Sequence, residues 1–177
     1  MKYLIATDIH GNKKSAQIIK EKFEQLGANK IILLGDLLYN GPRNPVEEDY
    51  SPKDVIEILN SLSDKIIAVK GNCDGEVDQM VLNFMLNDCA VIELNGKTYF
   101  CTHGHHINQA SPAKIAKGEV VLYGHFHKTE VTNVDDVTYL NIASITFPKN
   151  NNVKCYGVLD ENGVCVYSLS DELILKV

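Results

Sequence analysis

The chain has little of several features that would mark particular classes of protein. It has no surplus of positive charge, because 17 lysines and arginines face 23 aspartates and glutamates, and the formal net charge is −6. With its lysines scattered along the sequence, the chain offers no basic field to hold a nucleic-acid backbone through counterion release. We therefore expect no extended DNA or RNA interface.

Long apolar segments are also missing. The amino terminus, MKYLIATDIHG, has one lysine and a short apolar stretch that runs directly into an aspartate and a histidine, unlike a signal peptide. No segment approaches the length of a transmembrane helix. The five cysteines form no CxxC pair, and most lie in apolar runs where a thiol packs as a small hydrophobe. We expect a reduced cytoplasmic protein that does not contact membranes.

The size and composition are those of one folded unit. With 177 residues, 45% of them hydrophobic and 23% charged, the chain is long enough for one sizeable core and too short for two ordinary domains. No internal repeat, low-complexity tract or linker interrupts it. We therefore treat residues 1–177 as a single domain.

Strand and helix signals alternate in the first 75 residues. Apolar runs predict strands over residues 2–7, 30–36 and 65–74, and helices are expected over 12–27 and 53–62. Asn12 and Gly27 are the candidate N-cap and C-cap of the first helix. This alternation favours parallel strands joined by helical crossovers on the faces of a sheet.

Strand-like runs crowd together in the second half. AVIELNGKTYF predicts a hairpin that turns at Asn95 and Gly96, the favoured pair for a two-residue loop. EVVLYGH, TEVTNV, VTYLNI, KCYGVLD, GVCVYSL and ELILKV follow as further strands with short turns. The simplest architecture is an α/β fold in which two sheets pack face to face and are flanked by helices.

Five of the expected strands end alike, in Asp, Asn or His and usually beside a glycine. They are IATDIHG, ILLGDLL, AVKGNCD, YFCTHGHH and VLYGHFH. Side chains at the carboxyl ends of such strands can converge although they are far apart in the sequence. All six histidines fall in three of these segments: His10, His103, His105, His106, His125 and His127.

A metal site accounts for this set better than separate structural roles do. Any one of these histidines alone would be a surface group, and Asp8 or Asp36 alone a helix cap. Together, carboxylates and imidazoles in such number leave repulsion and desolvation that a cation compensates. In an extended segment His125 and His127 point to the same side, and can reach two neighbouring metals. Asp8 and His10 can do so too.

The order of these motifs resembles a known family. D-x-H, G-D, G-N, H-G-H and G-H-x-H, running from Asp8 to His127, are similar to the calcineurin-like metallophosphoesterases, and GDLLYNGPRNP, KGNCDGEVDQM and THGH resemble a small bacterial phosphodiesterase branch. The resemblance implies a four-layer α/β/β/α sandwich of two mixed sheets flanked by helices. It also implies a dinuclear site whose ligands are Asp8, His10, Asp36 and His127 for one metal, and Asp36, Asn72, His103 and His125 for the other.

The resemblance further implies the chemistry. Two divalent metals lower the pKa of a bridging water, and the resulting hydroxide attacks phosphorus in line, with Asp36 bridging the ions. Nitrogen and oxygen ligands without thiolate favour Mn²⁺, with Ni²⁺, Fe²⁺, Zn²⁺ and Co²⁺ as other candidates. The expected substrate is a small phosphate diester. A homodimer or higher oligomer is suggested, because close relatives commonly associate.

The chain departs from the family pattern at two places. Many relatives read G-N-H, with the histidine as general acid, where this chain has Cys73. A buried apolar cysteine is the preferred interpretation there, over a catalytic or metal-binding thiol. His105 is the tentative proton donor or orienting group in its place. Arg43 is a tentative phosphate ligand, as is Asn72, since the arginine of G-D-x-x-x-R-G is absent.

Three functions stay open at this point. The preferred one is a metal-dependent phosphodiesterase. A phosphomonoesterase or nucleotide phosphatase is the nearest competitor, but alkoxide leaving groups gain most from the missing acid. A non-catalytic interaction scaffold, as in a retromer subunit that resembles this fold, is the third, and the complete ligand set argues against it. The physiological substrate is not readable from the sequence.

Overall fold

The larger sheet has seven strands in the order β12-β11-β10-β1-β2-β3-β4. In this computed structural model, which describes residues 1–177, they are β1 (Tyr3–Ala6), β2 (Lys30–Leu33), β3 (Ile66–Val69), β4 (Leu86–Asn87), β10 (Cys155–Asp160), β11 (Gly163–Ser168) and β12 (Leu173–Lys176). Strands β1 to β4 pair in parallel, whereas β10 to β12 pair antiparallel and join the sheet beside β1. The sheet is therefore mixed, and the end of the chain completes it.

The second sheet has five strands in the order β5-β6-β7-β9-β8. They are β5 (Ala90–Leu94), β6 (Lys97–Cys101), β7 (Val120–Tyr123), β8 (Glu130–Val134) and β9 (Val137–Asn141). The predicted β5–β6 hairpin is confirmed, and its turn residues Asn95 and Gly96 have φ values of 52° and 74°, as a type I′ turn requires. Strand β7 runs parallel to both of its neighbours, so this sheet is mixed too.

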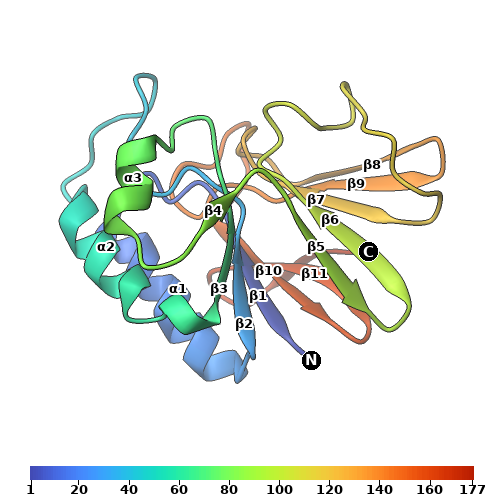
Figure 1. Ribbon diagram of the computed structural model, residues 1–177, viewed down its shortest axis with the longest axis horizontal. Helices are drawn as coiled ribbons and strands as arrows, with labels where there is room; N and C mark the ends of the chain where they lie inside the picture. The colour runs from blue at the N-terminus through green and yellow to red at the C-terminus, as the bar shows by residue number, and fades with distance from the viewer.

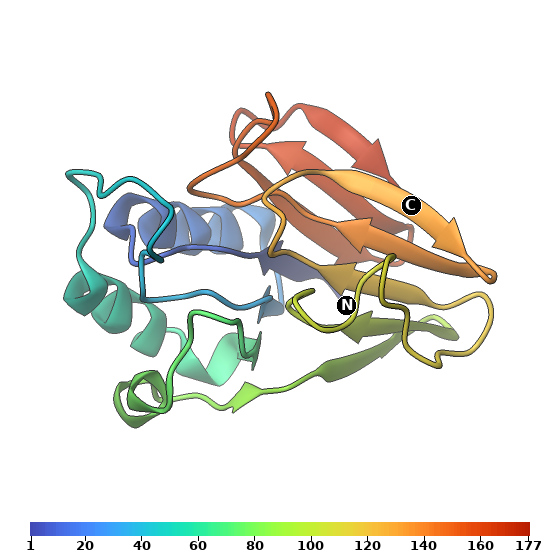
Figure 2. The same ribbon diagram turned by 90° about the horizontal axis from the view of Figure 1, so that it is seen from above.

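The helices all lie on one side of the seven-stranded sheet, as the two views show (Figures 1 and 2). They are α1 (Lys13–Leu26), α2 (Pro52–Asn60), α3 (Glu76–Val81) and the short 3₁₀ helix η1 (Ser63–Lys65). Both predicted caps of α1 are confirmed, because Asn12 accepts a hydrogen bond from the Ser15 N–H and Gly27 is left-handed. Helix α3 and strand β4 were not expected. No helix combines the length and apolarity that crossing a membrane requires.

Two apolar layers hold the sheets and helices together. Seventeen buried residues, among them Ile5, Leu122 and Leu140, fill the space between the sheets. Another seventeen, including Leu4 and Ile19, lie between the larger sheet and its helices. The predicted α/β arrangement of two mixed sheets flanked by helices is confirmed.

The expected fourth layer, on the outer face of the second sheet, is not helical. Irregular chain between β6 and β7 covers that face, and Ile115 packs there against buried residues such as Tyr123 and Val121. Pro112 has no N–H to donate, and Gly118 has a φ of 85°, so both work against a continuous helix in this short segment. The sandwich thus has helices outside one sheet and a loop outside the other.

Candidate metal centre

The first group of converging side chains comprises Asp8, His10 and His127. Asp8 and His10 follow β1, and His127 follows β7, so two sheets contribute to the group. Asp8 Oδ1 lies 3.3 Å from His127 Nε2 and 3.7 Å from His10 Nε2, and the two imidazole nitrogens are 3.2 Å apart. All three side chains are buried. The structure thus brings together three predicted ligands that are up to 119 positions apart in the chain (127 − 8).

The tautomers of these histidines indicate what the group can bind. His10 Nδ1 is 2.9 Å from the Tyr39 carbonyl oxygen, and His127 Nδ1 is 2.6 Å from that of Phe147. A carbonyl only accepts, so each Nδ1 donates its hydrogen, and Nε2 is the nitrogen that is left to offer a lone pair to a metal. Asp8 Oδ1 is buried and has no hydrogen-bond partner. Two lone pairs and an unpartnered carboxylate oxygen that face one another fit a divalent cation.

The second group comprises Asp36, His103 and His125, together with Asn72. His103 Nε2 lies 3.4 Å from Asp36 Oδ2 and 3.0 Å from Asn72 Oδ1, and the rings of His103 and His125 are 5.1 Å apart. These residues follow β2, β3, β6 and β7. All seven predicted ligands therefore lie at the carboxyl ends of neighbouring strands, within one edge of the sandwich.

Asp36 connects the two groups. Its Oδ1 accepts a hydrogen bond from the Cys73 N–H at 2.8 Å, which fixes the carboxylate. Its Oδ2 lies 3.8 Å from His10 Nε2, in the first group, and 3.4 Å from His103 Nε2, in the second. One oxygen thus anchors the side chain and the other is shared, as a ligand between two cations would require.

Charges within the two groups also suit cations. Burial lowers the pKa of His103, but the Asp36 and Asp8 carboxylates outweigh it and raise that pKa to about 9. Burial and the charge of His103 lower the pKa of His125 to about 4, so its imidazole is neutral at pH 7. Burial raises the pKa of Asp36, but the hydrogen bond from His103 and the charge of His103 have a larger effect in the opposite direction. The net result is a lowered pKa. The carboxylates are therefore ionised, and in the metal-free protein a protonated His103 opposes their charge. A divalent cation would take over this role, with His103 releasing its proton as it became a ligand.

The backbone at the site is left-handed at five of the seven predicted ligands. Their φ values lie between 51° and 67° at Asp8, His10, Asp36, His125 and His127. Such a conformation costs a non-glycine residue about 1–2 kcal/mol, and clusters of such strain are typical of functional sites. The expectation that His125 and His127 share one side of an extended segment is wrong. Each lies in a left-handed turn, and they reach different groups because the chain bends between them.

Two glycines permit the close approach of these loops. A Cβ on Gly124 would lie 2.6 Å from Asp8 Oδ2 and overlap the Thr7 side chain, and a Cβ on Gly71 would overlap the Asp36 carboxylate and backbone. Any larger residue would push a ligand out of place. The glycines beside the polar strand ends are thus part of the site.

Asp74 is a functional residue that the sequence interpretation missed. Its buried carboxylate accepts hydrogen bonds from the N–H groups of Asp36 and Leu37, at 2.8 and 2.7 Å, and from that of Gly71 at 2.7 Å. It therefore ties the loop after β2 to the loop after β3 and positions Asp36. An aspartate two residues after Asn72, in a loop where backbone N–H groups need acceptors, was the available signal.

Replacing Asp74 with alanine should loosen both loops. We expect the free energy of unfolding of the metal-free protein to fall by about 3 kcal/mol or more, because each hydrogen bond to a charged group contributes about 1.5–3 kcal/mol. Denaturation by urea measures this. Asp78→Ala is the matched control, since Asp78 accepts one exposed hydrogen bond from Gly75, and its loss should cost less than about 1 kcal/mol. Equal effects of the two substitutions would rule out the positioning role of Asp74.

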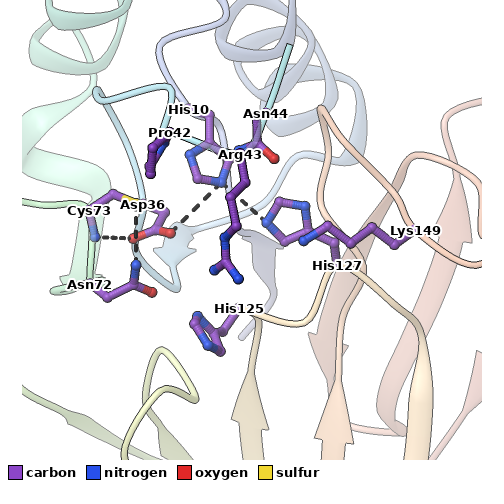
Figure 3. A pocket seen from close by; sticks show the side chains of 11 residues that line it. His10, Asp36, Pro42, Arg43, Asn44, Asn72, Cys73, His125, His127 and Lys149 are labelled. Atoms are coloured by element: carbon purple, nitrogen blue, oxygen red, sulfur yellow. Dashed lines mark hydrogen bonds and ion pairs between the residues drawn. The ribbon is translucent and has the colours of Figure 1, made fainter.

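A cavity of about 150 Å³ lies over the two groups (Figure 3). Arg43 reaches into it, toward the space between Asp36 and the two histidines after β7, and Lys149 lines its far wall. Lys149 was not singled out from the sequence, since a lone lysine in a polar loop carries no signal. The charged groups of Arg43 and Lys149 are both placed to contact an anionic ligand.

Cys73 lines this cavity as well. It belongs to none of the apolar clusters, so the interpretation as a buried apolar cysteine is wrong. Its thiol is half-buried, and its Sγ accepts a hydrogen bond from the Asn72 side-chain amide at 3.3 Å. Burial and the Asp36 charge raise the pKa of Cys73 to about 12. Such a thiol neither ionises nor gives up its proton readily near neutral pH.

The fold and the two groups that share Asp36 define a class, that of α/β sandwich proteins with candidate metal ligands at the strand ends. Residues 1–163 match the sequence model of the calcineurin-like phosphoesterase superfamily domain. The chain belongs to this superfamily, as its motifs suggested.

Curated relatives match over most of the chain. Phosphodiesterase YfcE of Escherichia coli K12 is 38% identical over 176 residues, which cover 99% of this chain and 96% of the relative. Phosphodiesterase MJ0936 of Methanocaldococcus jannaschii is 28% identical over 149 residues, or 80% of this chain and 82% of that protein.

Two solved structures share the fold of this chain. The structure of YfcE from E. coli, described as a phosphoesterase, has a TM-score of 0.95 at 37% identity and covers 100% of this chain and 98% of its own. Vps29 of Entamoeba histolytica with Zn²⁺ has a TM-score of 0.63 at 21% identity, covering 98% of this chain and 96% of its own, and shares the fold alone.

Proposed function

We propose that this chain is a metal-dependent phosphodiesterase that hydrolyses small phosphate diesters. The observation that carries the proposal is the convergence of two ligand groups on Asp36, at the base of a cavity with two cationic side chains. Relatives named phosphodiesterases, one of them 38% identical over 99% of the chain, support the same activity.

The proposed ligands divide between two ions. Asp8, His10, Asp36 and His127 would hold one, and Asp36, Asn72, His103 and His125 the other. Two divalent cations in such a site supply activation of water as a nucleophile and neutralisation of charge on the phosphoryl oxygens. Mn²⁺ is the proposed ion, with Ni²⁺, Fe²⁺, Zn²⁺ and Co²⁺ as alternatives, because imidazole and carboxylate ligands without thiolate suit these metals.

The side chains of the cavity would bind and orient the phosphate. Arg43 offers planar donors that suit two phosphoryl oxygens at once, and Lys149 offers a point charge on the other side. Asn72, at the rim, presents its amide to the same space. Their role would be positioning, which brings phosphorus in line for attack.

Diesters with good leaving groups should be the preferred substrates. The cavity holds a thiol with a pKa of about 12 where many members of the family are expected to carry an imidazole, so it lacks a group that readily protonates a departing alkoxide. His105 does not fill this place well. Burial and the charge of His103 lower the pKa of His105, which makes the charged, proton-donating form of its imidazole less available.

Rates on two substrates test the proposal. After reconstitution with each candidate metal, we expect an aryl phosphate diester to be hydrolysed at least about tenfold faster than an alkyl phosphate monoester, since alkoxides depend most on an acid. Metal content is measured on the same samples. The reverse preference would favour a phosphomonoesterase. A protein that retains no cation and hydrolyses neither substrate would favour a non-catalytic scaffold.

A further inference from the structure

A second cavity, of about 670 Å³, adjoins the first. It lies at the carboxyl ends of β3 and β6, beside the chain that joins β4 to β5. Its walls include Asn72, Asp88, Phe100, His105, His106 and Ile107. Asn72 also lines the first cavity, so the two spaces meet at a proposed metal ligand.

Aromatic rings form much of the wall next to the metal centre. The rings of His105 and His106 are 4.0 Å apart, and that of His105 is 5.3 Å from His103 and 6.1 Å from His125. His105 Nδ1 is buried without a hydrogen-bond partner. His106 is exposed and Phe100 half-buried, so faces or edges of both rings remain accessible. Neither His105 nor His106 has a role in the proposed reaction.

The sizes of the two cavities indicate that the substrate occupies both of them. The cavity over the metal centre measures about 150 Å³, less than the usual ligand pocket of about 300–1,000 Å³. The ester groups must therefore extend outside the first cavity. The second cavity is of the right size and begins at Asn72.

The charges in the second cavity do not favour an anionic group. Lys70 is its only lysine or arginine, and Asp74 and Asp88 oppose it. A further phosphate would gain little there. Accessible rings at a wall shared with the metal centre instead suit a flat apolar group, because aromatic faces stack at small entropic cost.

We propose that the second cavity binds a planar aromatic ester group of the substrate, stacked on His106 and His105. The proposal rests on the phosphodiesterase activity proposed above. Cys73, at the position of the family's general acid, lines only the first cavity, so the leaving group departs on that side. The group in the second cavity is therefore the one that stays on phosphorus.

Two diesters with the same leaving group test this. Phenyl 4-nitrophenyl phosphate and methyl 4-nitrophenyl phosphate differ only in the retained group. Stacking of a ring on an aromatic side chain tightens binding by roughly 5- to 150-fold. We therefore expect His106→Ala to lower kcat/KM for the phenyl ester about tenfold and to change that for the methyl ester less than twofold. His106→Phe keeps a ring and should keep the wild-type ratio.

Binding gives a second readout that does not require turnover. Calorimetry should show that phenyl phosphate binds more tightly than methyl phosphate, and that His106→Ala removes most of this difference. Hydrolysis of both esters with equal sensitivity to His106→Ala would overturn the stacking site and leave the phosphodiesterase standing. Selective binding of phenyl phosphate without hydrolysis of any diester would overturn the activity and leave the aromatic site standing.

Discussion

Replacing Asp36 with asparagine is expected to lower phosphodiesterase activity more than about 1,000-fold. Removal of one preorganised stabilising group in an active site costs about 10²–10³ in rate. Asp36 Oδ2 faces His10 and His103, so its loss weakens both proposed cation sites at once. Steady-state rates on an aryl diester, together with metal analysis of the same protein, measure the effect.

Asparagine is the sharpest substitution at this position because it removes the charge and keeps the shape. Its carbonyl oxygen can still accept from the Cys73 N–H, as Asp36 Oδ1 does. Asparagine also tolerates the φ of 57° that residue 36 adopts, which alanine would not. The variant should fold, so a loss of activity would report on the metal centre and not on the loop.

Asp54→Asn provides the matched control. Asp54 pairs with Lys13 at 3.0 Å on the exposed surface of α2, and such pairs contribute little. Its removal should leave activity and bound metal unchanged. If Asp36→Asn retained two cations per chain and the wild-type rate, Asp36 would not be the shared ligand, and the proposed mechanism would fail.

Local patterns predicted the framework because they report local causes. Asn12 begins α1 with a side-chain hydrogen bond, and Gly27 ends it in a left-handed backbone conformation. Each residue type favours this role by itself. Asn95 and Gly96 set the β5–β6 turn in the same way. The convergence of the seven predicted ligands followed from the rule that parallel strands end at one edge.

Other features depend on tertiary contacts that no local pattern records. The left-handed backbone at His125 and His127 is imposed by strand ends that meet, so an extended segment was the natural but wrong expectation. Asp74 matters through three N–H donors, two of which lie more than 30 residues away. Lys149 enters the cavity because its loop passes beside it. Each requires knowing which loops lie next to one another.

Replacing Cys73 with histidine is expected to raise the rate on diesters with poor leaving groups about 100-fold, because a positioned general acid contributes about 10²–10⁴-fold. The thiol lines the cavity over the metal centre, and its raised pKa makes it a poor donor. An imidazolium in its place can protonate the departing oxygen. Aryl diesters whose phenols span a range of pKa values measure the effect as a shallower dependence of rate on that pKa.

The leaving groups separate acid catalysis from a general improvement of the site. A 4-nitrophenolate needs little protonation, so its rate should change only slightly in Cys73→His, whereas that of an alkoxide should rise most. Asparagine resembles histidine in polarity and size but has no titratable proton. The Cys73→Asn variant should therefore keep the steep dependence of rate on the pKa of the leaving group. If Cys73→Asn accelerated the poor leaving groups as much as Cys73→His, the gain would come from packing beside Gly41, which lies next to the thiol. If neither did, protonation of the leaving group would not limit the reaction, and the proposed preference for diesters would need another cause.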